Sequence, residues 1–114
     1  MNITIFGTGY VGLVSAGCFA SINHNVTCCD ITSERIEILT KGQVPIYEPG
    51  LEDLIEKGYS SGNLTFTSFP KDSLENPDLV MICDGTPDIG TGETNMEAIE
   101  NCAKTISKYS NHSF

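Results

Sequence analysis

A chain of 114 residues, 39% of them hydrophobic, can bury one core but hardly two, so its length predicts a single domain. The formal net charge of −9 at pH 7 repels polyanions, which argues against nucleic acid or an anionic membrane as a partner. The sequence shows neither a secretory leader nor an apolar run long enough to cross a membrane, so we expect a cytoplasmic protein.

The first predicted strand, residues 3–6, leads directly into a G-x-G-x-x-G pattern at Gly7, Gly9 and Gly12. In such a turn the first glycine lets the chain leave the strand sharply, and the second leaves the backbone open to a pyrophosphate. The third lets the following helix pack closely on the sheet. That helix is predicted at 11–22, from apolar residues that recur at helical spacing: Val11, Val14, Cys18 and Ile22. Its N-terminus would stabilise an anion without a Lys or Arg nearby.

A second strand is predicted at 25–29 and ends at Asp30, eighteen residues past Gly12. A carboxylate there can accept hydrogen bonds from ribose hydroxyls and would repel the 2′-phosphate of NADP, so the pattern favours NAD. Arg35, in the next predicted helix, could lie along the ribose and its phosphates, or could be a solvated charge paired with a glutamate of its own helix. Together these features predict a dinucleotide-binding βαβ unit.

The rest of the chain continues to alternate helix and strand, which predicts an α/β Rossmann-like fold with a doubly wound parallel sheet. Periodicity and turn residues predict helices at 33–41, from 51 and from 94, strands at 64–68 and 79–83, a rigid loop at 43–51 and an acidic turn at 72–77. The fourth strand is apolar throughout, as a central parallel strand should be. The last helix should bury an apolar stripe: Met96, Ile99, Cys102, Ala103 and Ile106.

The cysteines are spaced as in neither a zinc site nor a disulfide framework. We therefore expect no metal site, and reduced thiols in the core at Cys18, Cys28, Cys29, Cys83 and Cys102. Cys28 and Cys29 are adjacent on one strand, so their side chains should point to opposite faces of the sheet.

Beyond these local patterns, the residues resemble one family over essentially the whole chain: the UDP-glucose/GDP-mannose dehydrogenases. The resemblance rests on I-F-G-T-G-Y-V-G-L at 5–13, on Asp30 followed by Arg35, on G-Q-V-P-I-Y-E-P-G-L at 42–51 and on G-T-P at 85–87. The P-I-Y-E-P-G-L run is far more specific than the glycine pattern. One departure is Asp84, where the family usually has a small or apolar residue; a carboxylate there could repel the cofactor phosphates or could point harmlessly to solvent.

The resemblance implies an N-terminal NAD-binding domain, followed in such enzymes by a long central helix and a C-terminal UDP-sugar domain, in a dimer or larger oligomer. These enzymes oxidise the C6 hydroxyl of UDP-glucose, or of a related UDP-N-acetylmannosamine or GDP-mannose, to a carboxylate. The reaction takes two NAD-dependent steps through an adduct on a cysteine that no cysteine of this chain matches. We therefore expect residues 1–114 to be a truncated NAD-binding domain, without the UDP-sugar domain, that binds NAD but does not turn over.

The site residues that the resemblance carries over all serve the cofactor, and none is catalytic. They are the turn glycines Gly7, Gly9 and Gly12, the pyrophosphate-binding N–H groups of Tyr10 and Val11, the ribose-binding Asp30 with Arg35 beside it, and Gly85 and Thr86 near the adenosine ribose. Glu48 could also serve a ligand, but we favour a role in fixing its own loop by accepting backbone hydrogen bonds.

Two other functions use a similar turn. A stand-alone NAD-binding regulatory module would need no nucleophile, and S-adenosylmethionine-dependent methyl transfer also employs a glycine-rich turn and a ribose-binding acid. The P-I-Y-E-P-G-L run favours a dehydrogenase over both. The edge of the sheet beyond the fourth strand would lack a partner strand, so self-association through that edge is a further expectation.

Overall fold

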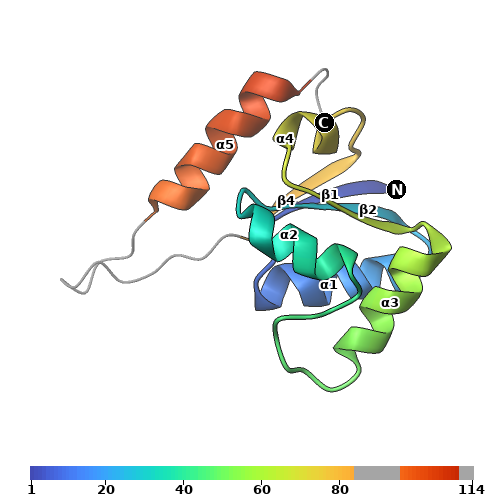
Figure 1. The fold of residues 1–114 in the computed structure, drawn as a ribbon. Helices are drawn as coiled ribbons and strands as arrows, with labels where there is room; N and C mark the ends of the chain where they lie inside the picture. Colours follow the sequence, from blue (N-terminus) through green and yellow to red (C-terminus); the bar gives the residue numbers. More distant parts are fainter. Residues whose placement is uncertain (84–95, 111–114) are drawn as a thin grey trace.

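The computed structural model describes residues 1–83 and 96–110 (Figure 1). Its strands are β1 (Asn2–Phe6), β2 (Asn25–Cys29), β3 (Leu64–Thr67) and β4 (Leu79–Ile82). Its helices are α1 (Tyr10–Ser21), α2 (Ser33–Thr40), α3 (Leu51–Ser61), α4 (Pro70–Ser73) and α5 (Glu97–Tyr109). No helix within these two ranges is long and apolar enough to cross a membrane.

The four described strands form one parallel sheet in the order β3-β2-β1-β4. The chain first adds strands on one side of β1 and then crosses to its other side, so the strand order reverses at β1. The register places Phe6 opposite both Cys29 and Ile82, which brings the carboxyl ends of β2, β1 and β4 to one edge of the sheet. This topology confirms the predicted α/β Rossmann-like sheet, and a crevice at such an edge is where this class of fold binds ligands.

Helices cover both faces of the sheet, as a doubly wound fold requires (Figure 1). On one face, α1, α2 and α3 enclose a cluster that includes Ile5, Leu13 and Cys28. On the other face, α4 and α5 pack over Phe6, Cys29 and Leu74. The neighbouring cysteines of β2 therefore lie in different cores, which confirms that their side chains point to opposite faces.

The buried face of α1 differs from the predicted stripe. Val11 and Ile22 are exposed, and Cys18 is exposed as well. The helix instead buries a face that includes its small residues: Gly12, Leu13, Ala16, Gly17 and Ala20. Because α1 is apolar nearly all round, the spacing of its apolar residues does not indicate which face is buried. The small residues determine the buried face, since they allow α3 to approach closely. A Cβ built on Gly17 would lie 3.2 Å from Cβ of Leu54 on α3.

Two predictions for the second half of the chain were wrong. A short helix, α4, replaces the start of the predicted acidic turn, because Pro70 is well suited to the first helical position. In α5, Met96 is 44% exposed and Ala103 is exposed, so only part of the predicted stripe is buried. The helix packs mainly through Cys102 and Ile106 against α4 and β4. Residues 94 and 95, where this helix was predicted to begin, lie outside the described residues.

The position of β4 at an edge of the described sheet contrasts with its apolar sequence, which is typical of a central parallel strand. Among the described strands it is hydrogen-bonded to β1 alone, which makes it an edge of this sheet. Leu79 is 38% exposed, and the other three residues of the strand are half-buried. Its uninterrupted apolar sequence is that of a strand covered on both faces, and no described strand pairs with its outer side.

We predict that Gly12→Ala destabilises the domain strongly. A Cβ at this position would lie 2.1 Å from the carbonyl oxygen of Gly7, so helix and turn would have to separate, at a cost of about 3 kcal/mol in unfolding free energy. Gly9→Ala is the matched control, because its Cβ would meet no atom within 4 Å and its φ of −78° suits any residue. Urea unfolding of both variants checks this; equal losses of stability would contradict it.

We also predict that thiol reactivity follows burial. Cys18 should react first with an aromatic disulfide reagent, because it is exposed on α1. Cys28 should react only on unfolding, because burial, with smaller contributions from Cys83 and Cys29, raises the pKa of its thiol and keeps it protonated. Loss of the fast phase in Cys18→Ser would confirm the assignment; a fast phase that persists in this variant would refute it.

Candidate dinucleotide-binding site

The glycine turn joins β1 to α1 at the carboxyl edge of the sheet. Gly7 has a φ of +104°, a left-handed conformation that favours glycine, and its N–H donates to the carbonyl of Cys29 over 2.9 Å. Gly9 is the N-cap of α1, and its carbonyl accepts the hydrogen bond from Leu13 N, 3.0 Å away. The turn is thus tied to β2 on one side and continuous with the helix on the other.

The three glycines differ in what surrounds them. Gly12 packs directly on the carbonyl of Gly7, with Cβ of Cys83 at the end of β4 only 3.6 Å from where its own Cβ would stand. Around Gly9, by contrast, there is open space. This contrast fits the predicted tasks, in which Gly12 permits helix packing and Gly9 leaves the backbone accessible. The N–H groups of the first helical turn, which belong to Tyr10 and Val11 among others, have no acceptor inside the helix and are suited to an anion.

Asp30, directly after β2, has its carboxylate fixed by neighbouring donors. Its Oδ2 atom accepts from the backbone N–H of Thr8 at 3.1 Å and from the Thr8 hydroxyl at 2.6 Å. Its Oδ1 atom accepts from the N–H of Thr32 at 2.9 Å. The side chain of Asp30 is only 9% exposed. The turn after β1 and the residue that ends β2 are therefore joined through this one carboxylate.

These contacts decide the ionisation of Asp30. Burial by itself raises the pKa of the carboxyl, but the hydrogen bonds from Thr8 and Thr32 and the positive charge of Arg35 outweigh burial and lower the pKa below its usual range. Asp30 is consequently a carboxylate at any pH near neutrality. It can accept hydrogen bonds from hydroxyl groups and repels a phosphate.

Arg35 lies beside Asp30, as predicted, with its Nη1 atom 3.6 Å from Oδ2. The alternative, a pairing with a glutamate of its own helix, is not seen; within residues 1–83 and 96–110 the ion pair formed is the one with Asp30. The guanidinium side chain is 53% exposed, so its outer N–H groups are free to meet a ligand from solvent.

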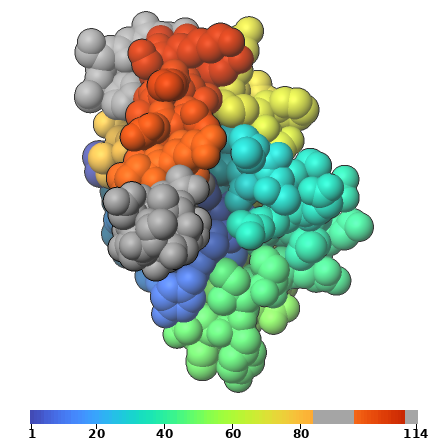
Figure 2. Space-filling view, turned by 90° about the vertical axis from the view of Figure 1, so that its left-hand side faces the viewer, coloured from blue at the N-terminus to red at the C-terminus, as the bar shows by residue number. Residues whose placement is uncertain are grey.

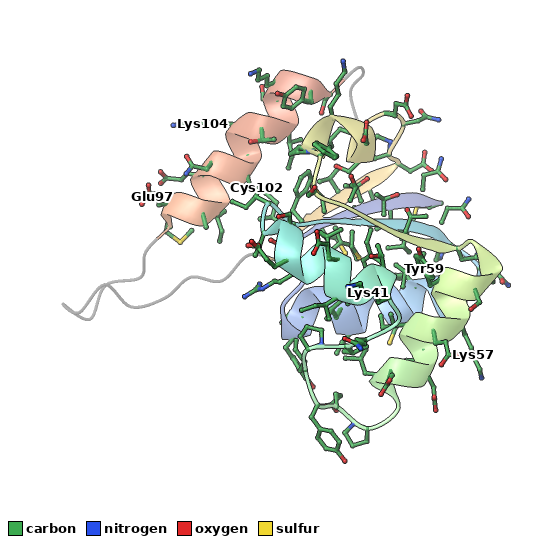
Figure 3. All side chains as sticks on the ribbon, in the orientation of Figure 1. Lys41, Lys57, Tyr59, Glu97, Cys102 and Lys104 are labelled. Atoms are coloured by element: carbon green, nitrogen blue, oxygen red, sulfur yellow. The ribbon has the colours of Figure 1, made fainter. Side chains whose placement is uncertain are left out.

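A pocket of about 430 Å³ opens beside Asp30, between the ends of β1 and β2 and the helix α5. Figure 2 looks onto this edge, where α5 lies beside α2 and above the blue residues of α1. The sheet contributes Phe6 and Cys29 to the wall, and α5 contributes Ala98 and Cys102. In Figure 3 Cys102 lies on the side of α5 that faces the sheet, whereas Lys104 points away. Mostly apolar walls next to a carboxylate suit a flat aromatic base attached to a ribose.

The segment at 43–50 forms a separate hollow of about 500 Å³ in front of α3. Tyr47 is 92% exposed at its tip. The hydrogen bond that Glu48 makes here uses its main-chain carbonyl, which accepts from Leu51 N at 3.1 Å. Among the described residues, therefore, the Glu48 carboxylate is not what fixes the loop, contrary to the role that we favoured.

The structure brings most of the predicted site residues together. Seven of them come together from the turn, the first turn of α1, the end of β2 and the first turn of α2; in chain order they are Gly7, Gly9, Tyr10, Val11, Gly12, Asp30 and Arg35. Gly85 and Thr86, together with Asp84, lie outside the described residues. Sequence reasoning missed Thr8 and Thr32, which bind Asp30, and the α5 wall of the pocket. Thr8 could have been noticed as the polar residue enclosed between two glycines of the turn.

A parallel sheet with a glycine turn and a carboxylate at its carboxyl edge defines the class of dinucleotide-binding domains. Within this class the chain belongs to the UDP-glucose/GDP-mannose dehydrogenase family, because the sequence model of that family's NAD binding domain matches residues 1–113.

Curated relatives agree with this assignment. The chain is 46% identical over 110 residues to the UDP-glucose 6-dehydrogenase TuaD of Bacillus subtilis, a match that covers 96% of this chain and 24% of that protein. It is 43% identical over 106 residues to a GDP-mannose 6-dehydrogenase of Pseudomonas savastanoi, covering 93% of this chain and 24% of that protein. The chain therefore spans about a quarter of the length of these relatives.

Solved structures show the same fold. A ternary complex of GDP-mannose dehydrogenase from Pseudomonas aeruginosa superimposes with a TM-score of 0.90 at 40% identity, over 93% of this chain and 24% of that one. The UDP-D-ManNAc dehydrogenase of Pyrococcus horikoshii gives a TM-score of 0.90 at 31% identity, over 96% of this chain and 26% of that one.

We predict that Asp30 stabilises the fold near neutral pH and ceases to do so in acid. A carboxyl whose pKa is lower in the folded than in the unfolded chain contributes stability above its unfolded pKa, and this contribution is lost as the pH falls through the folded pKa. Asp30→Asn should therefore be less stable than the wild type at pH 7, and the gap should narrow toward about pH 3. Urea unfolding at both pH values measures the gap; a constant gap would contradict the prediction.

Proposed function

We propose that this chain is the cofactor domain of an NAD-dependent nucleotide-sugar 6-dehydrogenase, with UDP-glucose as the substrate of the whole enzyme. The observation that carries the proposal is the ionised Asp30 held beside an open glycine turn at the carboxyl edge of the sheet, in a chain that the family's NAD binding domain model matches over residues 1–113. UDP-glucose is preferred because the relatives at 46% and 44% identity carry that name. GDP-mannose and UDP-N-acetylmannosamine are the alternatives, since relatives named for them match at 43% and 31% identity.

The residues present fit a bound dinucleotide. The first turn of α1 with Gly9 would hold the pyrophosphate by backbone N–H groups, and Asp30 with Arg35 would hold the adenosine ribose. The pocket beside Ile31 and Cys102 would take the adenine. Gly85 and Thr86 belong to the same proposal as neighbours of the adenosine ribose. When bound, NAD supplies the hydride acceptor for oxidation of a sugar alcohol.

The chemistry of sugar oxidation would need parts beyond this domain. Three of the five cysteines are unsuited to act as a nucleophile here, because Cys28, Cys29 and Cys102 are buried, and Cys28 is held protonated. We therefore propose that residues 1–114 form a truncated NAD-binding domain, and that the UDP-sugar domain corresponds to the three quarters of the relatives' length that this chain does not match.

The remaining parts of the proposal concern context. The spacing of the five cysteines matches no disulfide framework, which suits a reducing compartment, and we propose the cytoplasm. We also propose that the whole enzyme is a homo-oligomer that supplies nucleotide-sugar acids to polysaccharide biosynthesis. No membrane and no nucleic acid would be a partner, because the net charge of −9 repels both kinds of polyanion.

We predict that the chain binds NAD more tightly than NADP, and that both Asp30→Ala and Gly9→Ala weaken NAD binding. Asp30→Ala removes the ribose acceptor and the charge that repels a 2′-phosphate, so NAD affinity should fall about tenfold or more and the preference over NADP should shrink. Gly9→Ala should weaken both dinucleotides, because a methyl group would stand where the backbone is open.

Calorimetric titration of the purified chain with each dinucleotide measures these affinities. Thr65→Ala serves as the control, because its hydroxyl donates to Thr27 on the neighbouring strand and lies away from the turn. Absence of NAD binding by the folded wild type, or an Asp30→Ala variant that binds NAD as well as the wild type, would overturn the proposal. Binding of S-adenosylmethionine in place of NAD would replace it with the methyltransferase alternative.

A further inference from the structure

Thr8 stands between two glycines of the turn and is 1% exposed. Both of its donors reach the same atom: the backbone N–H lies 3.1 Å and the hydroxyl 2.6 Å from Oδ2 of Asp30. Valine would fill nearly the same volume at this position but could not donate a hydrogen bond. The role of the Thr8 hydroxyl is therefore its hydrogen bond to the Asp30 carboxylate.

The two donors of Thr8 determine which part of Asp30 stays open. A carboxylate has about four acceptor positions, two on each oxygen. Thr8 fills both positions on Oδ2, and the guanidinium of Arg35 lies beside that oxygen. Oδ1 accepts from Thr32 N, so donors from the described residues leave one position, on Oδ1. Without the Thr8 hydroxyl, the carboxylate could rotate, and its two oxygens could accept from different donors.

We propose that Thr8 is the positioning residue for dinucleotide selection: its hydroxyl fixes Asp30 so that one open acceptor position meets a ribose hydroxyl and the negative charge stays where it opposes a 2′-phosphate. This inference rests on the proposed function, because it takes Asp30 as the group that binds ribose. It adds a residue that acts through Asp30 and does not itself touch the ligand.

A purely structural role would be to tie the turn to the end of β2. That tie exists without the hydroxyl, since Gly7 N donates to the Cys29 carbonyl over 2.9 Å and Thr8 N donates to Asp30. The two roles differ in what they predict. Loosening of the turn weakens NAD and NADP alike, whereas release of Asp30 weakens NAD and relieves the exclusion of NADP.

The decisive variant is Thr8→Val, which removes the hydroxyl and keeps the shape and the backbone N–H. Titration calorimetry of the 114-residue chain with NAD and NADP should show NAD affinity reduced about tenfold and NADP affinity unchanged or higher. Thr8→Ser should restore the wild-type ratio. Thr4→Val is the matched control: it removes another buried hydroxyl, which donates to the Ser73 carbonyl away from the site, and should leave the ratio unchanged.

A second readout follows Asp30 itself. Titration of its carboxyl carbon by NMR should give a midpoint below the ordinary value of 3.8 in the wild type and closer to that value in Thr8→Val. In an Asp30→Ala background, Thr8→Val should no longer alter the NAD-to-NADP ratio, because its target is gone. A ratio that is unchanged in Thr8→Val alone, or an Asp30 midpoint that does not move, would overturn the inference.

Failure of this inference is distinguishable from failure of the proposed function. If the folded wild type binds no dinucleotide, the proposed function is wrong, and so is the inference about dinucleotide selection. If it binds NAD but Thr8→Val weakens both dinucleotides by the same factor, only the inference about Thr8 falls. Should Thr8→Val not fold, Thr8→Ala removes the same hydroxyl; if neither folds while Thr8→Ser does, Thr8 is structural and the inference is wrong.

Discussion

The close contact between Gly12 and the carbonyl of Gly7 is the constraint on which the arrangement of this domain depends. A single methyl group on Gly12 would lie 2.1 Å from that oxygen, so only glycine allows the first turn of α1 to rest on the turn that leaves β1. This contact sets where the N-terminus of the helix stands relative to the sheet. The anion-binding N–H groups are thereby placed at the carboxyl edge, next to the end of β4 and the end of β2.

Small residues extend this close packing along the whole of α1. Gly17 lies against Leu54 of α3, and Gly58 of α3 lies against Ala20 of α1 and Leu64 of β3. The helix is therefore held by short contacts at its start, its middle and its end. A helix fixed at three points carries its N-terminus as a rigid part of the site, so a ligand bound there would not have to order it first.

The sequence predicts those features of the domain that depend on local patterns of residues. The order of strands and helices, the glycine turn and the carboxylate after β2 follow from periodicity and from residue types that have few alternatives, such as glycine at a left-handed φ. Side-chain burial was less predictable: α1 is apolar all round, so nothing in its spacing indicated that Leu13 is buried and Val11 is not. The α5 wall of the pocket depends on packing between segments that are far apart in the chain, as does the Thr8 bond to Asp30.

A net charge of −9 and a site for an anionic ligand are compatible because the two act over different distances. The long-range field of the acidic surface is screened within about 8 Å at physiological ionic strength, whereas N–H groups at a helix N-terminus act in direct contact. Next to these donors the described part of the chain places the carboxylate of Asp30 and the partly exposed cation of Arg35. In the function that we propose, the backbone would accept the charge common to all dinucleotides, and Asp30 would oppose an additional phosphate on the ribose. Selectivity would then arise from one fixed side chain, and affinity for the pyrophosphate from the fold.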